Sequence, residues 1–328
     1  METIEYASSA DGTRPLYADV EFTRDGRPKP LLAVMHGYNG SKEHVATDLR
    51  DLSARGVFAI APDMRGCGKS AGRFDSNGLD VHDILDAVLA AVAKFPGEID
   101  ARNLNIVGYS GGGANAAYCA VRFPDLFRTA VSFFGFTDCA AWFRSSARVD
   151  CNVRMAQAIG GTPDEKPAEY DARNINPAAG NITATRLHFF WDQEEVQCPP
   201  DIVQEFIANH RALGLNNVFA HISRPGDERR WHHGYRTDNP DLAAADSIFL
   251  AEVLAPASAS PCLPTRGRLV VPGYLVTRQF AVWIEDGQAG RATVEYDLNA
   301  QEPRVRVVES TGRFRVRIDP RTPLADLP

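Results

Sequence analysis

The sequence predicts an α/β fold: a mostly parallel sheet flanked by helices, followed by a small C-terminal all-β module. Short apolar runs alternate with segments of helical periodicity, which is typical of a parallel sheet covered on both faces. The runs at 31–35 and 57–61 are continuously apolar, like strands buried on both sides. Beyond residue 261 the helical periodicity stops and short segments alternate apolar and polar residues, which predicts the module.

The expected strands of the sheet follow one another with helices between them. In chain order they are Ile4–Ala7, Leu16–Phe22, Leu31–Met35, Val57–Ala61, Leu104–Val107, Thr129–Phe134, Arg186–Trp191 and Val218–Ile222. The helical patterns between them are Lys42–Arg55, Leu79–Lys94, Ala114–Phe123 and Asp201–Leu213. Because a helix that joins two strands of one sheet leaves them parallel, we expect a parallel sheet after the first strands.

Two interruptions of this rhythm predict the domain organisation. The segment at about 138–181 contains Pro, Gly and scattered aromatic residues, and we interpret it as an insertion or cap over the carboxyl ends of the strands. A linker of small residues and prolines at 255–261 separates an α/β domain over 1–254 from a β-domain over 262–328. So small a β-domain has little core of its own, so we expect it to dock on the larger one.

The expected strands of the β-domain are short. They are Arg268–Leu275, Gln279–Ile284, Ala292–Tyr296, Val305–Val308 and Arg313–Ile318.

Composition excludes several classes of function. The 328 residues carry a net charge of −7, which gives no electrostatic footprint for nucleic acid or anionic lipid. No apolar stretch approaches the roughly 18 residues that span a bilayer, so we expect no membrane partner. The N-terminus lacks the basic and apolar regions of a signal peptide, so we expect a cytoplasmic protein, or a secreted one whose leader lies outside this sequence. The 6 scattered cysteines predict free, mostly buried thiols, with a Cys139–Cys151 bridge as the alternative.

The most informative stretch of the chain surrounds Ser110. A short apolar run meets this serine, glycines stand two residues before and two after it, and a small-residue helical pattern follows. This layout is typical of a nucleophile elbow, a turn so tight that bulky neighbours would clash. The turn lifts the hydroxyl above the sheet, where the amides of the following helix point to the same place. We therefore predict Ser110 as a nucleophile.

A serine nucleophile needs a histidine that takes its proton and a carboxylate that holds this histidine. After an elbow of this type the chain order is nucleophile, acid, histidine. The histidine candidates are His232 and His233, which follow the last strand of the expected sheet. We favour His233 because Gly234 and Tyr235 follow it directly.

The acid is expected on the loop after the strand Arg186–Trp191. That loop offers three carboxylates: Asp192, Glu194 and Glu195.

Together these motifs resemble the α/β-hydrolase superfamily, and within it the prolyl oligopeptidase and dienelactone hydrolase branch. The resemblance covers roughly residues 1–250. The motifs that carry it are His36-Gly37-Tyr38-Asn39-Gly40, Asp63-Met64-Arg65-Gly66-Cys67-Gly68, the Ser110 elbow, Gly160-Gly161-Thr162-Pro163, Asn176-Pro177 and His233-Gly234-Tyr235. The resemblance implies an α/β-hydrolase fold and a serine hydrolase that uses no metal and no organic cofactor.

The resemblance also ranks the three carboxylates. In this branch the acid loop reads H-G-x-x-D-x-x-V-P, and its alignment without gaps on residues 191–199 puts Glu195 at the acid position. Glutamate there replaces the usual aspartate, and Asp192 stands where glycine is expected, so a shifted loop would make Asp192 the acid. Glu195 is therefore the first candidate, Asp192 the second and Glu194 the third.

An oxyanion formed during acyl transfer needs two N–H donors held in place. In this fold the residue after the nucleophile, Gly111, supplies one amide. The resemblance implies that Tyr38, on the loop after the strand Leu31–Met35, supplies the other.

The expected function is hydrolysis of a carboxylic ester through an acyl-enzyme, with a small-molecule or polymer-linked ester as substrate. A peptidase or amidase of the same mechanism and a carbohydrate acetyl esterase remain alternatives. The sequence shows no long propeller of the kind that gates the oligopeptidases it resembles, which favours esters. An inactive hydrolase scaffold that serves as a binding module is the non-enzymatic alternative, and a homodimer is a further open expectation.

Overall fold

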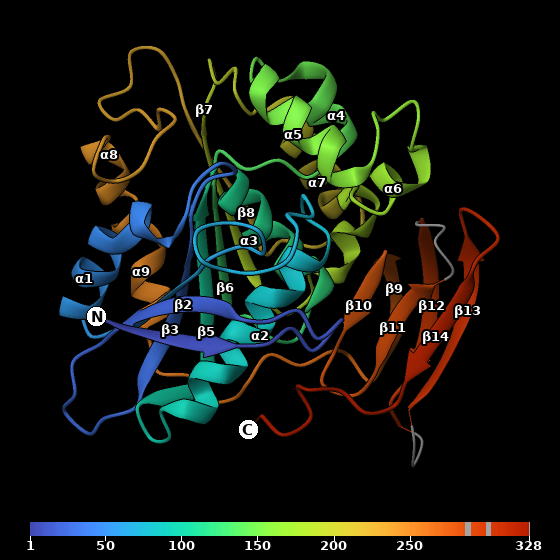
Figure 1. Cartoon of the computed structure of the whole chain (residues 1–328), viewed down its shortest axis with the longest axis horizontal. Coiled ribbons are helices and arrows are strands. Elements are labelled where there is room, and N and C mark those ends of the chain that lie inside the picture. Colours follow the sequence, from blue (N-terminus) through green and yellow to red (C-terminus); the bar gives the residue numbers. More distant parts are fainter. Residues whose placement is uncertain (286–289, 300–302, 328) are drawn as a thin grey trace.

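The computed structural model describes residues 1–285, 290–299 and 303–327 and confirms the α/β-hydrolase fold with a C-terminal all-β module (Figure 1). An eight-stranded sheet has the order β1-β2-β4-β3-β5-β6-β7-β8. Its strands are β1 Glu2–Tyr6, β2 Leu16–Glu21, β3 Lys29–Met35, β4 Phe58–Pro62, β5 Ile99–Tyr109, β6 Thr129–Phe133, β7 Arg186–Asp192 and β8 Val218–Ser223. The pairs β1–β2 and β2–β4 are antiparallel and all later pairs are parallel, as predicted.

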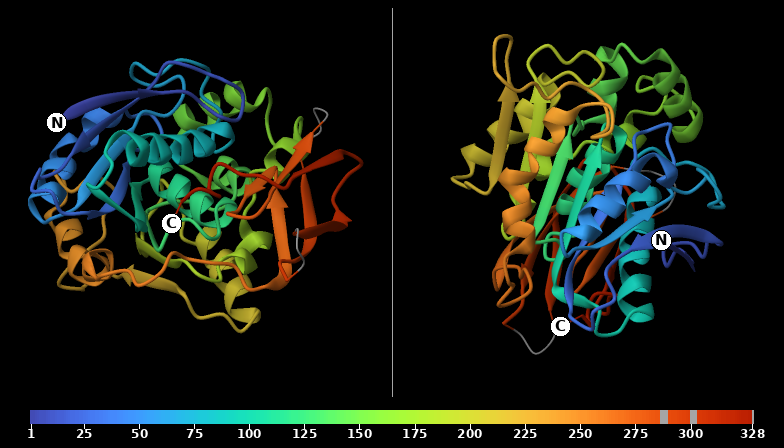
Figure 2. Two further views of the ribbon diagram at one scale, coloured as in Figure 1. Left: turned by 90° about the horizontal axis from the view of Figure 1, so that it is seen from below. Right: turned by 90° about the vertical axis from the view of Figure 1, so that its left-hand side faces the viewer.

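Helices cover both faces of this sheet. One layer contains α1 (Ala46–Ala54), which follows the 3₁₀ turn Lys42–Val45, and α9 (Asp246–Leu254). The other contains α2 (Leu79–Lys94), α3 (Gly111–Arg122) and α7 (Asp201–Ala212), and Figure 2 shows the sheet between the layers. The short helix α8 (Pro240–Ala244) precedes α9. Strand β4 is buried at every residue and β3 is buried from Leu31 to Met35, which explains the continuously apolar sequence of these two segments.

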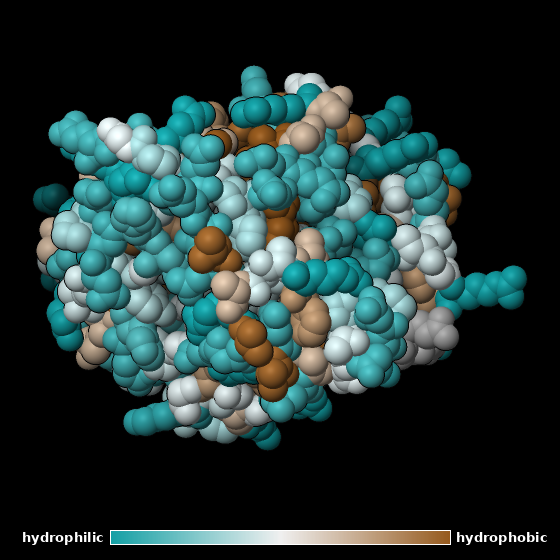
Figure 3. Space-filling view, turned by 90° about the horizontal axis from the view of Figure 1, so that it is seen from above, coloured by the Kyte–Doolittle hydropathy of each residue, from teal (hydrophilic) through white to brown (hydrophobic). Residues whose placement is uncertain are grey.

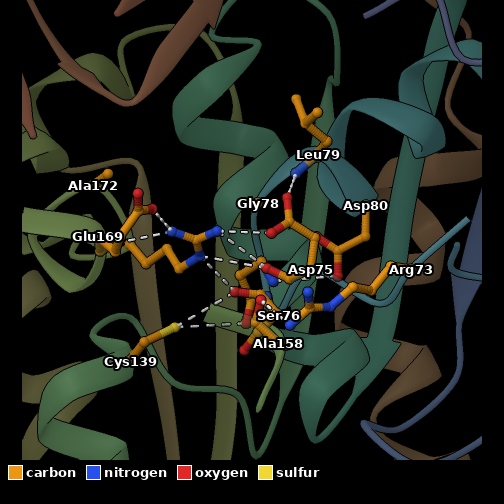
Figure 4. Close-up of polar contacts among 12 residues, drawn as sticks. Arg73, Asp75, Ser76, Gly78, Leu79, Asp80, Cys139, Ala158, Glu169 and Ala172 are labelled. Carbon is orange, nitrogen blue, oxygen red and sulfur yellow. Dashed lines mark hydrogen bonds and ion pairs between the residues drawn. The ribbon is translucent and has the colours of Figure 1, made fainter. Parts of the chain in front are cut away.

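The insertion after β6 is helical. It comprises α4 (Cys139–Ser145), α5 (Val149–Ile159), α6 (Pro167–Asp171) and the 3₁₀ turn η2 (Asn176–Asn181), and α4 to α6 lie together at the upper right in Figure 1. The Arg173 guanidinium, after α6, bonds Asp75 and Glu169 at 2.8 Å each, and Figure 4 shows these two carboxylates at the joint between this cap and the loop before α2. This partly buried ion-pair cluster connects the cap to the loop before α2.

The C-terminal module consists of two three-stranded antiparallel sheets, β10-β11-β14 and β13-β12-β9. Its strands are β9 Arg266–Pro272, β10 Tyr274–Val276, β11 Ala281–Glu285, β12 Arg291–Asp297, β13 Arg304–Ser310 and β14 Arg315–Asp319. The prediction of one strand over Arg268–Leu275 is wrong, because Gly273 has φ +78° and turns the chain from one sheet into the other. The boundaries predicted for the two domains remain a prediction.

The module packs on the α/β part through buried contacts. Arg122, from α3, donates to the carbonyl oxygen of Pro272 at 3.1 Å and lies over the Tyr274 ring, 4.5 Å from its centroid. The Asn181 side chain, at the end of η2, makes two hydrogen bonds to the backbone of Val270, at 2.7 and 2.9 Å. Tyr274 also belongs to the main hydrophobic core. The module therefore shares part of its interior with the larger domain.

The surface over the cap side of the molecule is mostly hydrophilic, with hydrophobic residues in small scattered groups (Figure 3). In the described part of the chain, every helix is too short or too polar to cross a bilayer.

Candidate active site

Ser110 occupies a strained turn between β5 and α3. Its φ of +56° lies in a region that non-glycine residues rarely adopt. Glycines make the turn sterically possible: a Cβ on Gly108 would lie 2.1 Å from the Gly112 carbonyl oxygen, and one on Gly112 would lie 2.3 Å from that of Met35. The elbow predicted from the G-x-S-x-G pattern is thus present, and its geometry explains why these positions carry no side chain.

The Ser110 side chain lines a cavity of about 250 Å³. The other lining residues are Gly37, Tyr38, Asn39, Gly40, His44, Tyr109, Arg148, His233, Gly234 and Tyr235. The elbow, the loop after β3, the histidine loop and the cap therefore meet in one cavity. Cys198, interpreted from sequence as a packing residue, is buried with its Sγ 4.0 Å from Ser110 Oγ.

Glu195 and His233 are in direct contact. His233 Nδ1 lies 3.1 Å from Glu195 Oε2, and the amides of Gln197 and Cys198 donate to Glu195 Oε1 at 2.6 and 3.1 Å. Burial alone would raise the pKa of Glu195, but the bonds from His233 and the two amides outweigh it and lower the pKa below its ordinary value. Because an ionised carboxylate only accepts, Nδ1 carries the proton and Nε2 is free to accept one.

The two other candidate acids lie elsewhere. Asp192 accepts two bonds from the Arg230 guanidinium, at 2.5 and 2.7 Å, and one from Ser223 Oγ at 2.6 Å. These bonds, above all those from Arg230, hold the pKa of Asp192 far below its ordinary value. Glu194 is exposed and also pairs with Arg230. The structure thus brings only Glu195 of the three to His233, whereas His232 is exposed to solvent.

The loop after β3 lies against the start of α3. A Cβ on Gly111 would lie 2.8 Å from the Tyr38 backbone nitrogen, so the two predicted oxyanion donors are neighbours. As the first residue of α3, Gly111 has an amide without a partner inside its helix. The Tyr38 side chain points away from this amide pair and hydrogen-bonds Ser76 Oγ at 2.6 Å. The backbones of Tyr38 and Gly111 are thus close together, and the oxyanion-hole role of both residues remains a prediction.

Buried groups behind this loop hold its shape. The Gly37 N–H donates to Tyr235 Oη at 2.8 Å, which ties the loop to the histidine loop. The Met64 N–H donates to His36 Nε2 at 3.4 Å, so the proton of this imidazole lies on Nδ1, which contacts the Gly37 carbonyl oxygen at 2.9 Å. Burial lowers the pKa of His36 to about 4, so the ring is neutral at physiological pH.

The cap contributes residues that the sequence analysis missed. From α5, Arg154 donates to the Tyr38 carbonyl oxygen at 3.3 Å and to Asn39 Oδ1 at 2.9 Å. The Asn39 amide in turn donates to Asp150 at 2.9 Å. Arg148, directly before α5, lines the cavity. No sequence pattern distinguishes these residues from the ordinary charged face of a surface helix, because only the fold of the cap turns them towards the elbow.

The cysteines add no bridge and no metal centre to this site. All six are free, and all but Cys262 are buried, so the alternative of a Cys139–Cys151 disulfide is wrong. Over the described residues, no three His, Cys, Asp or Glu side chains are grouped as metal ligands.

Comparison with known proteins decides the family. A model of the prolyl oligopeptidase family matches residues 44–255, which include Ser110, Glu195 and His233. The chain belongs to the prolyl oligopeptidase family. The suspected membership of this branch of the α/β hydrolases, a branch of serine hydrolases, is confirmed. A search of curated proteins found no match.

Solved structures of this fold include peptidases and an esterase. The Pyrococcus horikoshii acylaminoacyl peptidase is 17% identical, with a TM-score of 0.62 over 79% of this chain and 42% of its own. Puromycin hydrolase is 20% identical, with a TM-score of 0.63 over 80% of this chain and 40% of its own. An esterase of Pyrococcus furiosus is 16% identical, with a TM-score of 0.56 over 77% of this chain and 91% of its own. The likeness thus covers less than half the length of the acylaminoacyl peptidase and of puromycin hydrolase, and at these identities it shows the fold alone.

Proposed function

We propose that this member of the prolyl oligopeptidase family hydrolyses a carboxylic ester through an acyl-enzyme, with Ser110 as nucleophile, His233 as base and Glu195 as acid. The observation that carries the proposal is the 3.1 Å contact between His233 Nδ1 and Glu195 Oε2, made by a histidine that lines the same cavity as Ser110. This contact orients the imidazole and leaves Nε2 to accept the serine proton.

The proposed reaction has two halves. Ser110 Oγ attacks the ester carbonyl carbon while His233 Nε2 takes its proton, and the amides of Tyr38 and Gly111 donate to the oxyanion. His233 then protonates the leaving alcohol, and an ester between substrate and Ser110 remains. In the second half His233 deprotonates water, which attacks this ester and releases the acid and free Ser110.

Two observations favour esters over peptides. The cavity at Ser110 has a volume of about 250 Å³, which suits a short acyl group better than several peptide residues. The esterase of Pyrococcus furiosus is similar to this chain over 91% of its length, whereas the acylaminoacyl peptidase is similar over 42%. Peptide hydrolysis is the second candidate, favoured by the family and by the likeness to the acylaminoacyl peptidase.

The nucleophile is tested first. Ser110→Ala should lower kcat on 4-nitrophenyl acetate by about 10⁴-fold or more, because the triad acts as a unit, and should leave the melting temperature nearly unchanged. A fluorophosphonate probe should label the wild type and not the variant. A wild type that is neither labelled nor active would instead support an inactive scaffold, and a variant that keeps a tenth of the activity would refute the role of Ser110.

The substrate class is tested with matched chromogenic substrates. We expect kcat/KM for 4-nitrophenyl acetate and butyrate to exceed kcat/KM for aminoacyl 4-nitroanilides, each corrected for the difference in intrinsic reactivity between ester and anilide. Preferential cleavage of the anilides after this correction would replace the esterase proposal with the peptidase one.

A further inference from the structure

We infer that Arg148 makes the active site selective for esters whose acyl group carries a carboxylate, and against those that carry an ammonium group. The inference rests on the proposed ester hydrolysis and names its substrate class. Its basis is the position of one guanidinium, which the cap places in the wall of the cavity that holds Ser110 and His233.

The charge of the cavity wall is one-sided. Arg148 is the only Arg, Lys, Asp or Glu among the described residues that line this cavity. A second guanidinium, that of Arg154, lies just behind the wall and bonds the Tyr38 carbonyl oxygen. Two carboxylates lie near these two cations: Asp150 of the cap, which bonds Arg148 and Asn39, and Glu195, which bonds His233 from behind the wall. Because Arg148 is in the wall itself, a negative group bound beside it is attracted and a positive one is repelled.

Three hydrogen bonds orient the Arg148 side chain, which is 38% exposed. Its Nε and Nη2 donate to the two oxygens of Asp150 at 2.8 and 2.7 Å, and its Nη1 donates to Gln197 Oε1 at 3.0 Å. A guanidinium has five N–H groups, and the described residues accept from three of those of Arg148. Two N–H groups can therefore bind a ligand. A carboxylate can accept both, and the fixed fork loses little conformational freedom when it binds.

Gln197 connects the Arg148 side chain to the proposed catalytic acid. Gln197 stands two residues after Glu195, and its amide donates to that carboxylate at 2.6 Å while its side chain accepts from Arg148. The acid loop thus holds the proposed specificity residue and the proposed catalytic acid together. A substrate carboxylate on Arg148 would lie at a fixed place relative to the elbow, which is what a specificity contact requires.

Three esters of matched length test the inference. They are 4-nitrophenyl esters whose six-carbon acyl groups end in a carboxylate (the half-ester of adipic acid), a methyl ester (methyl adipate) or an ammonium (6-aminohexanoate). We expect the wild type to show the highest kcat/KM for the carboxylate, an intermediate value for the methyl ester and the lowest for the ammonium. Added salt should reduce the spread, because the cavity opens to solvent.

The variants separate Arg148 from the general charge of the protein. Arg148→Gln should lower the ratio of kcat/KM between the carboxylate and methyl esters by about 10- to 100-fold, the effect of a lost charge-assisted hydrogen bond, and Arg148→Lys should keep part of it. Arg144→Gln is the matched control, because Arg144 lies on the same cap but is exposed and pairs with Asp164. It should leave all ratios as in the wild type.

A binding measurement separates this inference from the proposed catalysis. In the Ser110→Ala background, calorimetric titration with the adipate half-ester should show a Kd about 10-fold or more weaker when Arg148→Gln is added. If the ratio of kcat/KM between the carboxylate and methyl esters and the Kd are the same with and without Arg148, the inference is overturned and Arg148 has only a structural role in the cap. This holds even if the protein hydrolyses the esters. A protein that binds the half-ester through Arg148 but hydrolyses none of the three esters would overturn the proposed function alone.

Discussion

Two carboxylates three residues apart, Asp192 and Glu195, have different neighbours, which predicts different roles for them. Asp192 binds Arg230 and Ser223, and Ser223 Oγ in turn accepts from the Trp231 N–H at 2.8 Å. This chain of bonds supports the loop that carries His233, so Asp192 acts on the histidine only through the backbone. Glu195 contacts the imidazole itself.

The first prediction separates the two carboxylates. Glu195→Gln should lower kcat by about 10²–10⁴-fold with a small change in stability, because the oxyanion donors remain. Asp192→Asn should change kcat far less but lower the free energy of unfolding by about 1–3 kcal/mol, since it leaves the Arg230 charge without its main partner. Steady-state kinetics and urea unfolding of both variants check this. The opposite division of effects would assign the acid to Asp192.

The second prediction concerns the adjacent histidines. His233→Ala should abolish turnover, because it removes the proposed base that Glu195 orients. His232→Ala removes an exposed side chain and should keep kcat within about threefold of the wild type. If the His232 variant were the inactive one, the histidine assignment would be wrong.

At the scale of elements, the site is an assembly of four loops braced by buried groups. The loop after β3 is held from behind by His36, from the histidine loop by Tyr235 and from the cap by Arg154. The neutral His36 ring is the titratable part of this brace. Its folded-state pKa of about 4 lies below the ordinary value of 6.5. The stability that it contributes is therefore complete above about pH 6.5 and is lost as the pH falls towards 4.

The third prediction follows from this linkage. Between pH 7 and pH 5 the protonation of this histidine in the unfolded chain should lower the free energy of unfolding by about 1–2 kcal/mol. The His36→Asn variant has no group at this position that titrates. Between pH 7 and pH 5 its free energy of unfolding should therefore fall by about 1–2 kcal/mol less than that of the wild type. Urea unfolding at pH 7 and pH 5 measures the loss of unfolding free energy in the variant and in the wild type. The difference between the two losses is compared, because other buried groups titrate in the same pH range. One of them is Asp80, whose pKa burial raises to about 7. Equal losses would show that His36 is not buried as a neutral ring.

At the scale of the whole molecule, Arg122 joins three parts of the chain. Besides Pro272 of the β-module, it donates to the carbonyl oxygens of Asn77 and Gly78 before α2, at 2.6 and 3.1 Å, and to that of Ala172 at 3.0 Å. It lies on α3, the helix that begins at the elbow. The β-module, the cap and the helix of the nucleophile are therefore held by one buried side chain.

The fourth prediction tests this joint. Arg122→Met should lower the free energy of unfolding by about 3–5 kcal/mol, because it leaves buried carbonyl groups without donors. It should also speed proteolytic cleavage in the linker at 255–261. Arg102→Met is the control, since Arg102 is exposed and its ion pair among the described residues is with Asp100 alone. A variant as stable and as protease-resistant as the control would show that the module is held by its apolar contacts instead.

The sequence alone predicted the strands of the main sheet and the turn at Ser110, because both depend on residues that are close together in the chain. The periodicity located all eight strands of the main sheet, and the glycines around Ser110 predicted the elbow, because a strained turn restricts side chains within a few residues. The same analysis did not identify the cap helices, because it interpreted their Pro- and Gly-containing segment as an irregular insertion, although α5 is amphipathic. It also predicted one strand across Gly273, because the apolar and polar residues alternate on both sides of this glycine. The turn is visible only in the structure, where Gly273 has a positive φ.

Contacts between distant segments were decided only by the tertiary structure. The sequence ranked Glu195 before Asp192 and Glu194 by position in the loop, but the sheet had to bring β7 and the histidine loop together before Glu195 contacted His233, 38 residues away in the chain. Arg148 and Arg122 are ordinary charged residues in the sequence. In the folded chain Arg148 lines the cavity, and Arg122 connects α3 with the β-module and the cap. These positions depend on the packing of segments that are far apart in the sequence.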